Sequence, residues 1–267
     1  MKLTGNIRKM GSSWSDPVQY RLPLGDRFIG MNPLIGHRIE MEYLGKIHCI
    51  RCGRETRKSF AQGYCYPCFI SAPETEECVL KPELCRAHEG IARDMEYAKK
   101  HCLIEHVVYL SFTSGLKVGV TRSTQVPTRW IDQGATEAVE LARTPNRYEA
   151  GRIEVAMKSF ISDRTNWRRM LSGTPGPDID LVEEKKRLAL LLPTVLQHYI
   201  TGNNDVTRIA YPVVHYPEKI KSLDFEKNKL VSGILTGIKG QYLLFSDGSV
   251  INMRKFGGYL IRFSSPD

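Results

Sequence analysis

The stretch that decides the fold carries two pairs of cysteines, Cys49-Ile50-Arg51-Cys52 and Cys65-Tyr66-Pro67-Cys68. Two residues separate the thiols within each pair, and twelve separate one pair from the next. This spacing lets both sulfurs of a pair bind one ion from a tight turn, and two pairs complete a tetrahedral zinc site with sulfur at about 2.3 Å. Because four ligands leave no vacant position, the sequence predicts structural zinc in a zinc-ribbon-like module. Four unrelated thiols and a redox dithiol are the alternatives.

A second group of candidate ligands follows this module. Cys78, Cys85, His88 and Cys102 offer three thiolates and one imidazole, again four ligands for zinc. Buried free thiols and an iron–sulfur cluster are the alternatives. The sequence therefore predicts one or two structural zinc sites.

The composition is that of a folded protein with a basic excess. Of the 267 residues, 42% are hydrophobic and 25% are charged, and 38 Lys and Arg against 29 Asp and Glu give a net charge of +9. We find no run of roughly 18 apolar residues and no secretory signal at Met1, so we expect a cytoplasmic protein with no membrane contact. The positive charge favours a polyanion as partner, and nucleic acid is the natural class.

The chain reads as an α+β multidomain protein with four segments. We expect residues 1–47 to be a β-rich segment that could join the C-terminal β segment, 48–103 to be the cysteine-rich zinc module, 104–172 to be a small three-stranded α/β domain, and 173–267 to be a helix plus a β-rich domain. Gly173-Thr174-Pro175-Gly176-Pro177 is the expected linker.

Periodicity and turn residues predict the main elements. Strands are expected at Val107–Ser111, Leu116–Thr121 and Ala138–Ala142, and a helix is expected after the capping residue Asn146. Helical spacing also predicts helices at Glu89–Lys100 and at Leu181–Ile200, the latter bent at Pro193. Asp247-Gly248, between Tyr242–Phe245 and Val250–Met253, predicts a hairpin.

One ordered set of residues carries a resemblance to a known family. The set is Val107-Val108-Tyr109-Leu110, then Lys117-Val118-Gly119-Val120-Thr121, then Arg129 and Glu154 on two successive helices. It resembles the GIY-YIG nuclease superfamily, in particular the phage and bacterial branch whose second motif reads Lys-Ile-Gly, over about residues 105–170. The whole chain also resembles a bacterial zinc-binding family described only as a domain of unknown function.

The resemblance implies a role for each matching residue. Tyr109 matches the tyrosine that helps to activate the attacking water, and Lys117 takes the place of the second-motif tyrosine. Gly119 matches the glycine that lets the strand approach the site. Arg129 matches the arginine that steadies phosphate charge, and Glu154 matches the carboxylate that holds a divalent metal, Mg²⁺ or Mn²⁺. The first motif lacks the family's glycine and isoleucine.

The residues support this assignment by themselves. Glu154 falls between Ala150 and Met157 on the apolar face of the expected helix, where a carboxylate is costly unless it is paired or bound to a cation. Magnesium prefers one or two carboxylates with phosphate oxygens and water. In the alternative interpretation Glu154 forms an ion pair with Arg129, while Tyr109 and Lys117 are ordinary strand residues.

A basic and aromatic group follows the α/β segment. Candidate nucleic-acid contacts are Arg122, Arg164, Trp167, Arg168 and Arg169, because such residues grip phosphates and stack on bases. A Trp anchored in the core beside solvated arginines is the alternative.

These patterns favour a zinc-containing, metal-dependent endonuclease that acts on DNA or RNA. A non-catalytic nucleic-acid-binding protein with a degenerate nuclease fold is the second hypothesis. An RNA-modifying enzyme is the third, although the sequence has no Gly-rich cofactor loop of the dinucleotide or P-loop kind.

Overall fold

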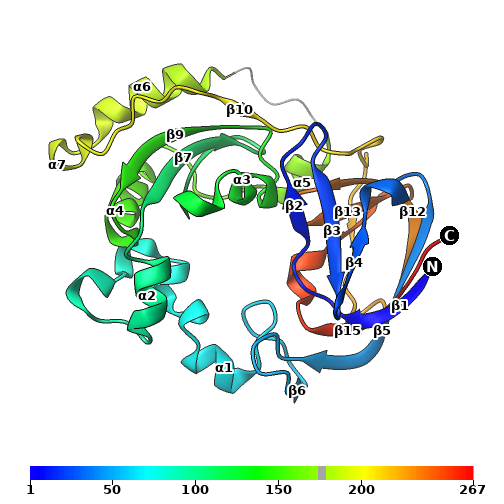
Figure 1. Ribbon diagram of the computed structural model, residues 1–267. Helices are drawn as coiled ribbons and strands as arrows, with labels where there is room; N and C mark the ends of the chain where they lie inside the picture. The colour runs from blue at the N-terminus through cyan, green and yellow to red at the C-terminus, as the bar shows by residue number, and fades with distance from the viewer. Residues whose placement is uncertain (174–178, 267) are drawn as a thin grey trace. The chain divides into compact units, whose positions relative to one another are not determined.

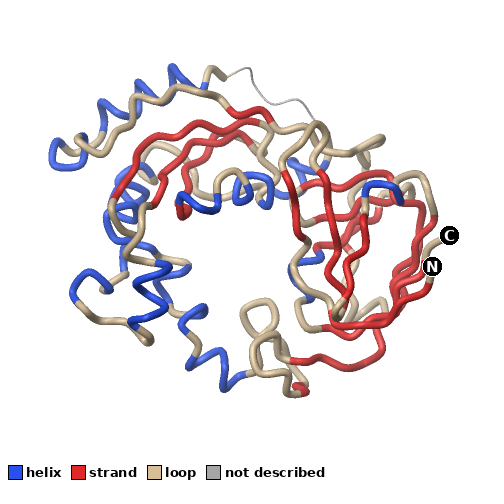
Figure 2. Tube along the Cα trace, viewed as in Figure 1, coloured by secondary structure: helices blue, strands red, loops and turns tan. Residues whose placement is uncertain are grey.

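The structure, a computed structural model, describes residues 1–173 and 179–266. The chain forms two compact units, of which the first contains 1–70, 168–173 and 209–266 and the second contains 71–167 and 179–208 within the described residues. Strands predominate in the first unit, whereas the second combines strands with helices (Figure 1 and Figure 2). Among the described residues, no helix has the length and apolar character that a membrane span requires.

The large sheet of the first unit draws its eight strands from both ends of the chain. Their order is β1-β15-β5-β12-β13-β14-β11, and β6 pairs with β5 beside this path. The bounds are β1 (Lys2–Asn6), β5 (Arg38–His48), β6 (Glu55–Thr56), β11 (Lys221–Ser222), β12 (Leu230–Lys239), β13 (Tyr242–Phe245), β14 (Ser249–Asn252) and β15 (Tyr259–Ser264). Because β15 is antiparallel to both β1 and β5, the N-terminal and C-terminal β segments share one sheet.

A smaller sheet completes the first unit, in the order β2 (Gly11–Ser13), β3 (Gln19–Leu24) and β4 (Arg27–Gly30). Tyr20, Leu22 and Leu24 are buried at every second position of β3, which is the pattern of a strand with one face on the core. The predicted hairpin is confirmed, because β13 and β14 pair around Gly248, whose φ is +79°. Two 3₁₀ turns also belong here, η1 (Asn32–Leu34) and η7 (Met253–Phe256).

The second unit is built on an antiparallel sheet in the order β10-β9-β7-β8. Its elements are β7 (His106–Phe112), β8 (Leu116–Arg122), β9 (Glu137–Thr144), β10 (Thr207–Arg208), α3 (Thr128–Asp132), α4 (Arg147–Met157), α6 (Leu181–Leu191) and α7 (Thr194–Gln197). The three predicted strands are present, with short β10 added at the edge. Asn146 caps α4 by accepting a hydrogen bond from the backbone N–H of Glu149 at 3.0 Å. Apolar residues of α4 and α6 share one core with β7 and β9.

The remaining elements are short helices and 3₁₀ turns. They are η2 (Pro73–Thr75), η3 (Glu77–Val79), η4 (Pro82–Leu84), η5 (Ala87–Glu89), η6 (Ser123–Gln125), α1 (Tyr66–Ser71), α2 (Met95–His101) and α5 (Trp167–Leu171). The predicted helix at Glu89–Lys100 was too long, since Gly90, with a φ of +80°, ends η5 and Asp94 caps α2. The predicted helix at Leu181–Ile200 does not bend at Pro193 but ends at Leu191, because proline cannot donate to the preceding turn.

The expected segments are divided differently in space. Residues 48–103 do not form one module: Cys49–Cys68 continues from β5 in the first unit, whereas Cys78, Cys85 and Cys102 lie in the second. Residues 173–267 are also divided, because the apolar face of α6, with Leu181 and Leu188, packs on the core beside β9. The expected linker falls on 173–177, of which 174–177 lie outside the described residues.

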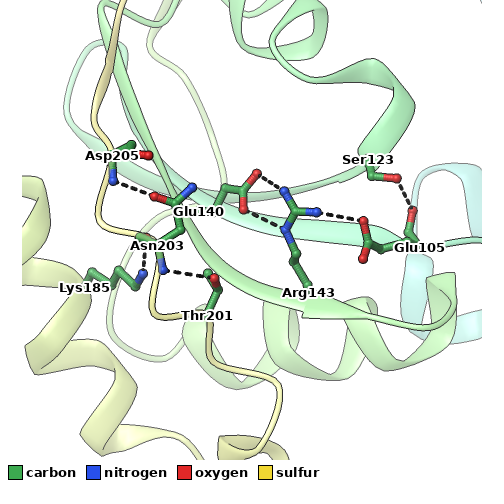
Figure 3. A network of polar contacts seen from close by, with 8 residues as sticks. All are labelled: Glu105, Ser123, Glu140, Arg143, Lys185, Thr201, Asn203 and Asp205. Carbon is green, nitrogen blue, oxygen red and sulfur yellow. Dashed lines mark hydrogen bonds and ion pairs between the residues drawn. The ribbon is translucent and has the colours of Figure 1, made fainter.

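Polar contacts fasten the chain that follows α7 to the sheet of the second unit (Figure 3). The ammonium of Lys185, on α6, is 3% exposed and donates to the backbone carbonyl of Asn203 at 2.5 Å. On β9, Arg143 forms two hydrogen bonds of 2.8 Å to Glu140 and one of 2.9 Å to Glu105. Lys185 thus ties α6 to the chain after α7, and that chain is tied to β9 because the backbone N–H of Thr201 donates to the carbonyl of Leu141 at 3.1 Å.

Candidate metal centres and active-site pocket

The four predicted ligands Cys49, Cys52, Cys65 and Cys68 lie together in the first unit. Their Sγ atoms all lie within 4.8 Å of one another, and those of Cys52 and Cys65 are 3.7 Å apart. The first pair leaves the end of β5 in a tight turn, in which the N–H of Gly53 donates to the carbonyl of Cys49 at 2.9 Å. Four thiols at this separation fit one tetrahedral ion.

The electrostatics of this cluster favour a bound cation. Burial opposes ionisation of Cys49, but hydrogen bonds from the backbone N–H groups of Cys52, Cys65 and Arg51 lower its pKa to about 6. Burial, followed by the neighbouring thiols, raises the pKa of Cys68 to about 12. Like charges in a small space resist ionisation together, so all four thiols become thiolates only around a cation.

The second cluster contains three cysteines, Cys78, Cys85 and Cys102, whose Sγ atoms also lie within 4.8 Å of one another. All three are buried, with exposed fractions of 6%, 3% and 5% in that order. The predicted fourth ligand, His88, lies outside this group, and its ring stacks on Tyr148 with centroids 4.3 Å apart. The cluster could hold a metal ion such as zinc through three protein thiolates.

The start of α4 holds the three-cysteine cluster in place. The backbone N–H of Arg147 donates to the carbonyl of Cys102 at 2.8 Å, and its guanidinium donates to the carbonyl of Cys78 at 3.2 Å. One turn further along, Gly151 lets η4 pack directly on the helix: a Cβ at Gly151 would lie 2.2 Å from the backbone nitrogen of Glu83. The segment between Cys78 and Cys85 is thus pressed against α4.

A polar cavity of about 170 Å³ lies beside this segment in the second unit. Its lining combines the predicted Lys117, Gly119, Arg129 and Glu154 with residues that we did not predict, namely Val79, Leu80, Pro82, Gln133, Lys158 and Asp163. Lys117 and Gly119 come from β8, Arg129 from α3 and Glu154 from α4. Three of the four predicted catalytic residues therefore line one cavity.

The fourth, Tyr109, lies behind the cavity wall. Its side chain is fully buried on β7, and its hydroxyl donates to Oε1 of Gln133 at 2.7 Å. A Cβ at Gly119 would lie 2.6 Å from this hydroxyl, so only glycine fits at that position of β8. Burial raises the pKa of Tyr109 to about 12. The hydroxyl can orient Gln133 but is a poor proton acceptor near neutral pH.

The charged groups of the cavity have unusual environments. Lys117 is 4% exposed, its ammonium donates to Oγ1 of Thr165 at 3.3 Å, and burial lowers its pKa to about 8. Glu154 is 9% exposed, and burial raises its pKa. Its nearest ion-pair partner among the described residues is Lys158, with Nζ 3.7 Å from Oε2, rather than Arg129.

The predicted nucleic-acid contacts come from different elements and from both units. Arg164 is almost fully exposed after α4, beside the cavity residue Asp163, with Nε 3.9 Å from Oδ1. Trp167, Arg168 and Arg169 form the first turn of α5. Arg122, at the end of β8, is half-buried near Tyr97, and burial lowers its pKa.

The sheets and the two clusters define a mixed α+β protein whose cysteines could bind metal ions such as zinc. Comparison with family models assigns the chain to a family. The chain belongs to the family described as "Protein of unknown function (DUF2797)", whose model matches residues 36–261. Neither the curated proteins nor the solved structures contain a significant match.

Proposed function

We propose that this protein is a divalent-metal-dependent phosphodiesterase, a nuclease of the GIY-YIG type that acts on DNA or RNA. The observation that carries the proposal is the convergence of Lys117, Arg129 and Glu154 on one cavity, although three different elements supply them. The chain order of β7, β8, α3, β9 and α4 supports the same type. The net charge of +9 supports a polyanionic substrate.

The donor atoms in the cavity fit a divalent cation. Glu154 is nine-tenths buried, and within residues 1–173 and 179–266 its carboxylate accepts no hydrogen bond and has only a loose ion pair. Magnesium and manganese favour such carboxylates together with phosphate oxygens and water. A divalent ion held here would supply Lewis-acid polarisation of a phosphodiester.

The side chains of the cavity would divide the remaining tasks. Arg129 has the planar guanidinium that can hold two non-bridging phosphate oxygens. Lys117 has a pKa of about 8, so part of the population carries a neutral amine near neutral pH that can accept a proton from water. Tyr109 would act as a positioning residue, since its hydroxyl holds the side chain of Gln133 at the wall.

We assign structural zinc to the four-cysteine cluster and a second zinc to the three-cysteine cluster. The first supplies four thiols and needs no further ligand. The second supplies three, and it lies next to the segment that forms the apolar wall of the cavity, Val79, Leu80 and Pro82. Zinc in this position would stabilise the wall without taking part in the chemistry.

Cleavage assays test the proposal. Zinc-loaded protein is incubated with supercoiled plasmid, single-stranded DNA and tRNA, with and without Mg²⁺ or Mn²⁺, beside Glu154→Ala. We expect metal-dependent cleavage of at least one substrate, and a loss of roughly a hundredfold or more in the variant. Glu183→Ala, which removes an exposed carboxylate on α6, is the matched control and should cleave normally.

A non-catalytic nucleic-acid-binding protein is the second candidate, and one observation favours it. Lys158 forms ion pairs with both Glu154 and Asp163, so each carboxylate has a cationic partner from the protein itself. This candidate predicts no cleavage under any condition, together with salt-sensitive binding that Glu154→Ala retains. That result would reject the nuclease.

A further inference from the structure

Three charged side chains at the end of α4 share one corner of the cavity. Nζ of Lys158 lies 3.2 Å from Oδ2 of Asp163 and 3.7 Å from Oε2 of Glu154. All three residues line the cavity. One ammonium group therefore stands between two carboxylates that come from different parts of the chain, Glu154 inside the helix and Asp163 in the segment after it.

Of the two carboxylates, Glu154 is the poorly satisfied one, whereas Asp163 lies 3.2 Å from the ammonium of Lys158 and 3.9 Å from Nε of Arg164. Glu154 is only 9% exposed, and no hydrogen bond to its carboxylate is found in the described part of the chain. A buried carboxylate without hydrogen bonds is costly. Its contact with Lys158 at 3.7 Å is longer than a hydrogen bond, so this corner of the cavity offers unused acceptor oxygens to a stronger cation.

Lys158 is placed so that it can leave. It is the residue that ends α4, and its side chain is one-third exposed, so it can extend into solvent without disturbing the core. Ion pairs of partly exposed lysines contribute little, because solvent screens them and the long side chain loses freedom. A divalent ion carries twice the charge of an ammonium and can bind carboxylate oxygens directly.

We propose that Glu154 and Asp163 together bind one divalent cation, and that Lys158 is the counter-ion that holds this place in the metal-free protein and leaves when the metal binds. The inference rests on the proposed function. The family resemblance implies one carboxylate ligand for the metal ion, Glu154, and the inference adds Asp163 as a second. It also makes the metal affinity of the protein depend on competition with its own lysine.

Direct measurement of Mn²⁺ binding, by electron paramagnetic resonance of the free ion with both cysteine clusters loaded with zinc, tests this inference without substrate. We expect one Mn²⁺ site in the wild type. Lys158→Gln should bind Mn²⁺ roughly fivefold more tightly, because the competing ammonium is gone. Asp163→Asn should bind it at least roughly tenfold more weakly, as should Glu154→Gln.

Two controls fix the interpretation. Lys186→Gln removes a lysine from an exposed pair with Glu183 on α6 and should leave Mn²⁺ binding unchanged. Asp163 is partly exposed, so Asp163→Asn preserves size and should fold normally, which circular dichroism checks. Unchanged Mn²⁺ affinity in Asp163→Asn, or unchanged or weaker affinity in Lys158→Gln, would overturn the inference.

The outcome separates this inference from the proposed function. Mn²⁺ binding with the expected variant effects, but no cleavage of any nucleic acid, would keep the cation site and reject the phosphodiesterase. Metal-dependent cleavage with full Mn²⁺ affinity in Asp163→Asn would keep the phosphodiesterase and reject the paired carboxylates. A wild type that binds no Mn²⁺ would reject the cation site.

Discussion

Lys239, on β12, is buried without a carboxylate partner in the described chain. Only 4% of the residue is exposed, and its ammonium lies 5.4 Å from the ring centroid of Tyr211 and 5.5 Å from that of Tyr216. Burial lowers the pKa of Lys239 to about 8. The aromatic rings offset part of the cost of burying a charge, and the remainder opposes folding.

This cost predicts that Lys239→Met stabilises the protein at pH 7. Because the folded pKa, about 8, is below the unfolded value, the unfolded state binds more protons between the two, and stability rises with pH across that range. At pH 7 both states are protonated and the penalty is complete, so we expect the variant to gain about 2 kcal/mol in the free energy of unfolding. Urea unfolding at pH 7 and pH 10 measures it. An equal gain at both values would contradict the titration of Lys239.

Cavity residues could be predicted from the sequence where they lie on a regular helix or strand. Glu154 was predicted from the family resemblance, and its position on the apolar face of the expected helix supported that prediction. Asp163 lies in an irregular segment, where spacing does not tell which way a side chain points. His88 was also predicted from spacing alone: it sits in η5, where its ring stacks on Tyr148, and it is not part of the group formed by the three thiols.

At the scale of elements, α4 organises the second unit. Its cap, Asn146, and its buried residues Ala150, Ile153 and Met157 were predictable from the sequence, whereas Phe160 lies beyond the helix end and is 47% exposed. The close contact between η4 and α4 was not predictable, because a local sequence pattern does not indicate which distant backbone segments are in contact. Gly151 is the residue that makes this contact, with the backbone of Glu83 against it.

Gly151→Ala should therefore destabilise the protein, although alanine favours helices. The new methyl group would meet the backbone of Pro82 at 2.4 Å and of Glu83 at 2.2 Å, and neither can move freely. We expect a net loss of about 2 kcal/mol, from an overpacking cost of up to about 3 less the helix preference of about 1. Thermal unfolding measures it. Gly115→Ala, where a methyl group meets no atom within 4 Å, is the control and should change stability little. Equal effects at both positions would contradict the packing described for η4.

At the scale of the whole molecule, the sequence indicated the mixed α+β class but divided the chain into consecutive blocks. The units are discontinuous in sequence: β1 and β5 pair with β12 or β15, and α6 packs on the sheet of residues 106–144. Pairing partners as far apart as Met41 and Phe263 leave no local signal, because any two strands with alternating patterns look compatible. The sequence analysis anticipated this pairing only in expecting that residues 1–47 could join the C-terminal β segment.

The division of the cysteines between the units predicts how metal is distributed. We expect two zinc ions per chain, one for each cluster. Cys85→Ser should lower the zinc content by one equivalent and loosen the cavity wall, whereas Cys65→Ser should remove the other equivalent. Elemental analysis of the purified variants gives the counts. A single zinc ion in the wild type that Cys85→Ser retains would reject metal at the three-cysteine cluster.

The pairing of β5 with β12 and β15 has a consequence for biosynthesis. A ribosome releases β5 long before β12 and β15 exist. Ile47 and His48 can pair early with β6, but most of the eleven residues of β5 stay unpaired until β12 and β15 have been made. The inner sheet of residues 106–144 and α4 involve only nearby chain and can form during that wait. Nascent first-unit strands are thus the part of this chain that most needs chaperone protection.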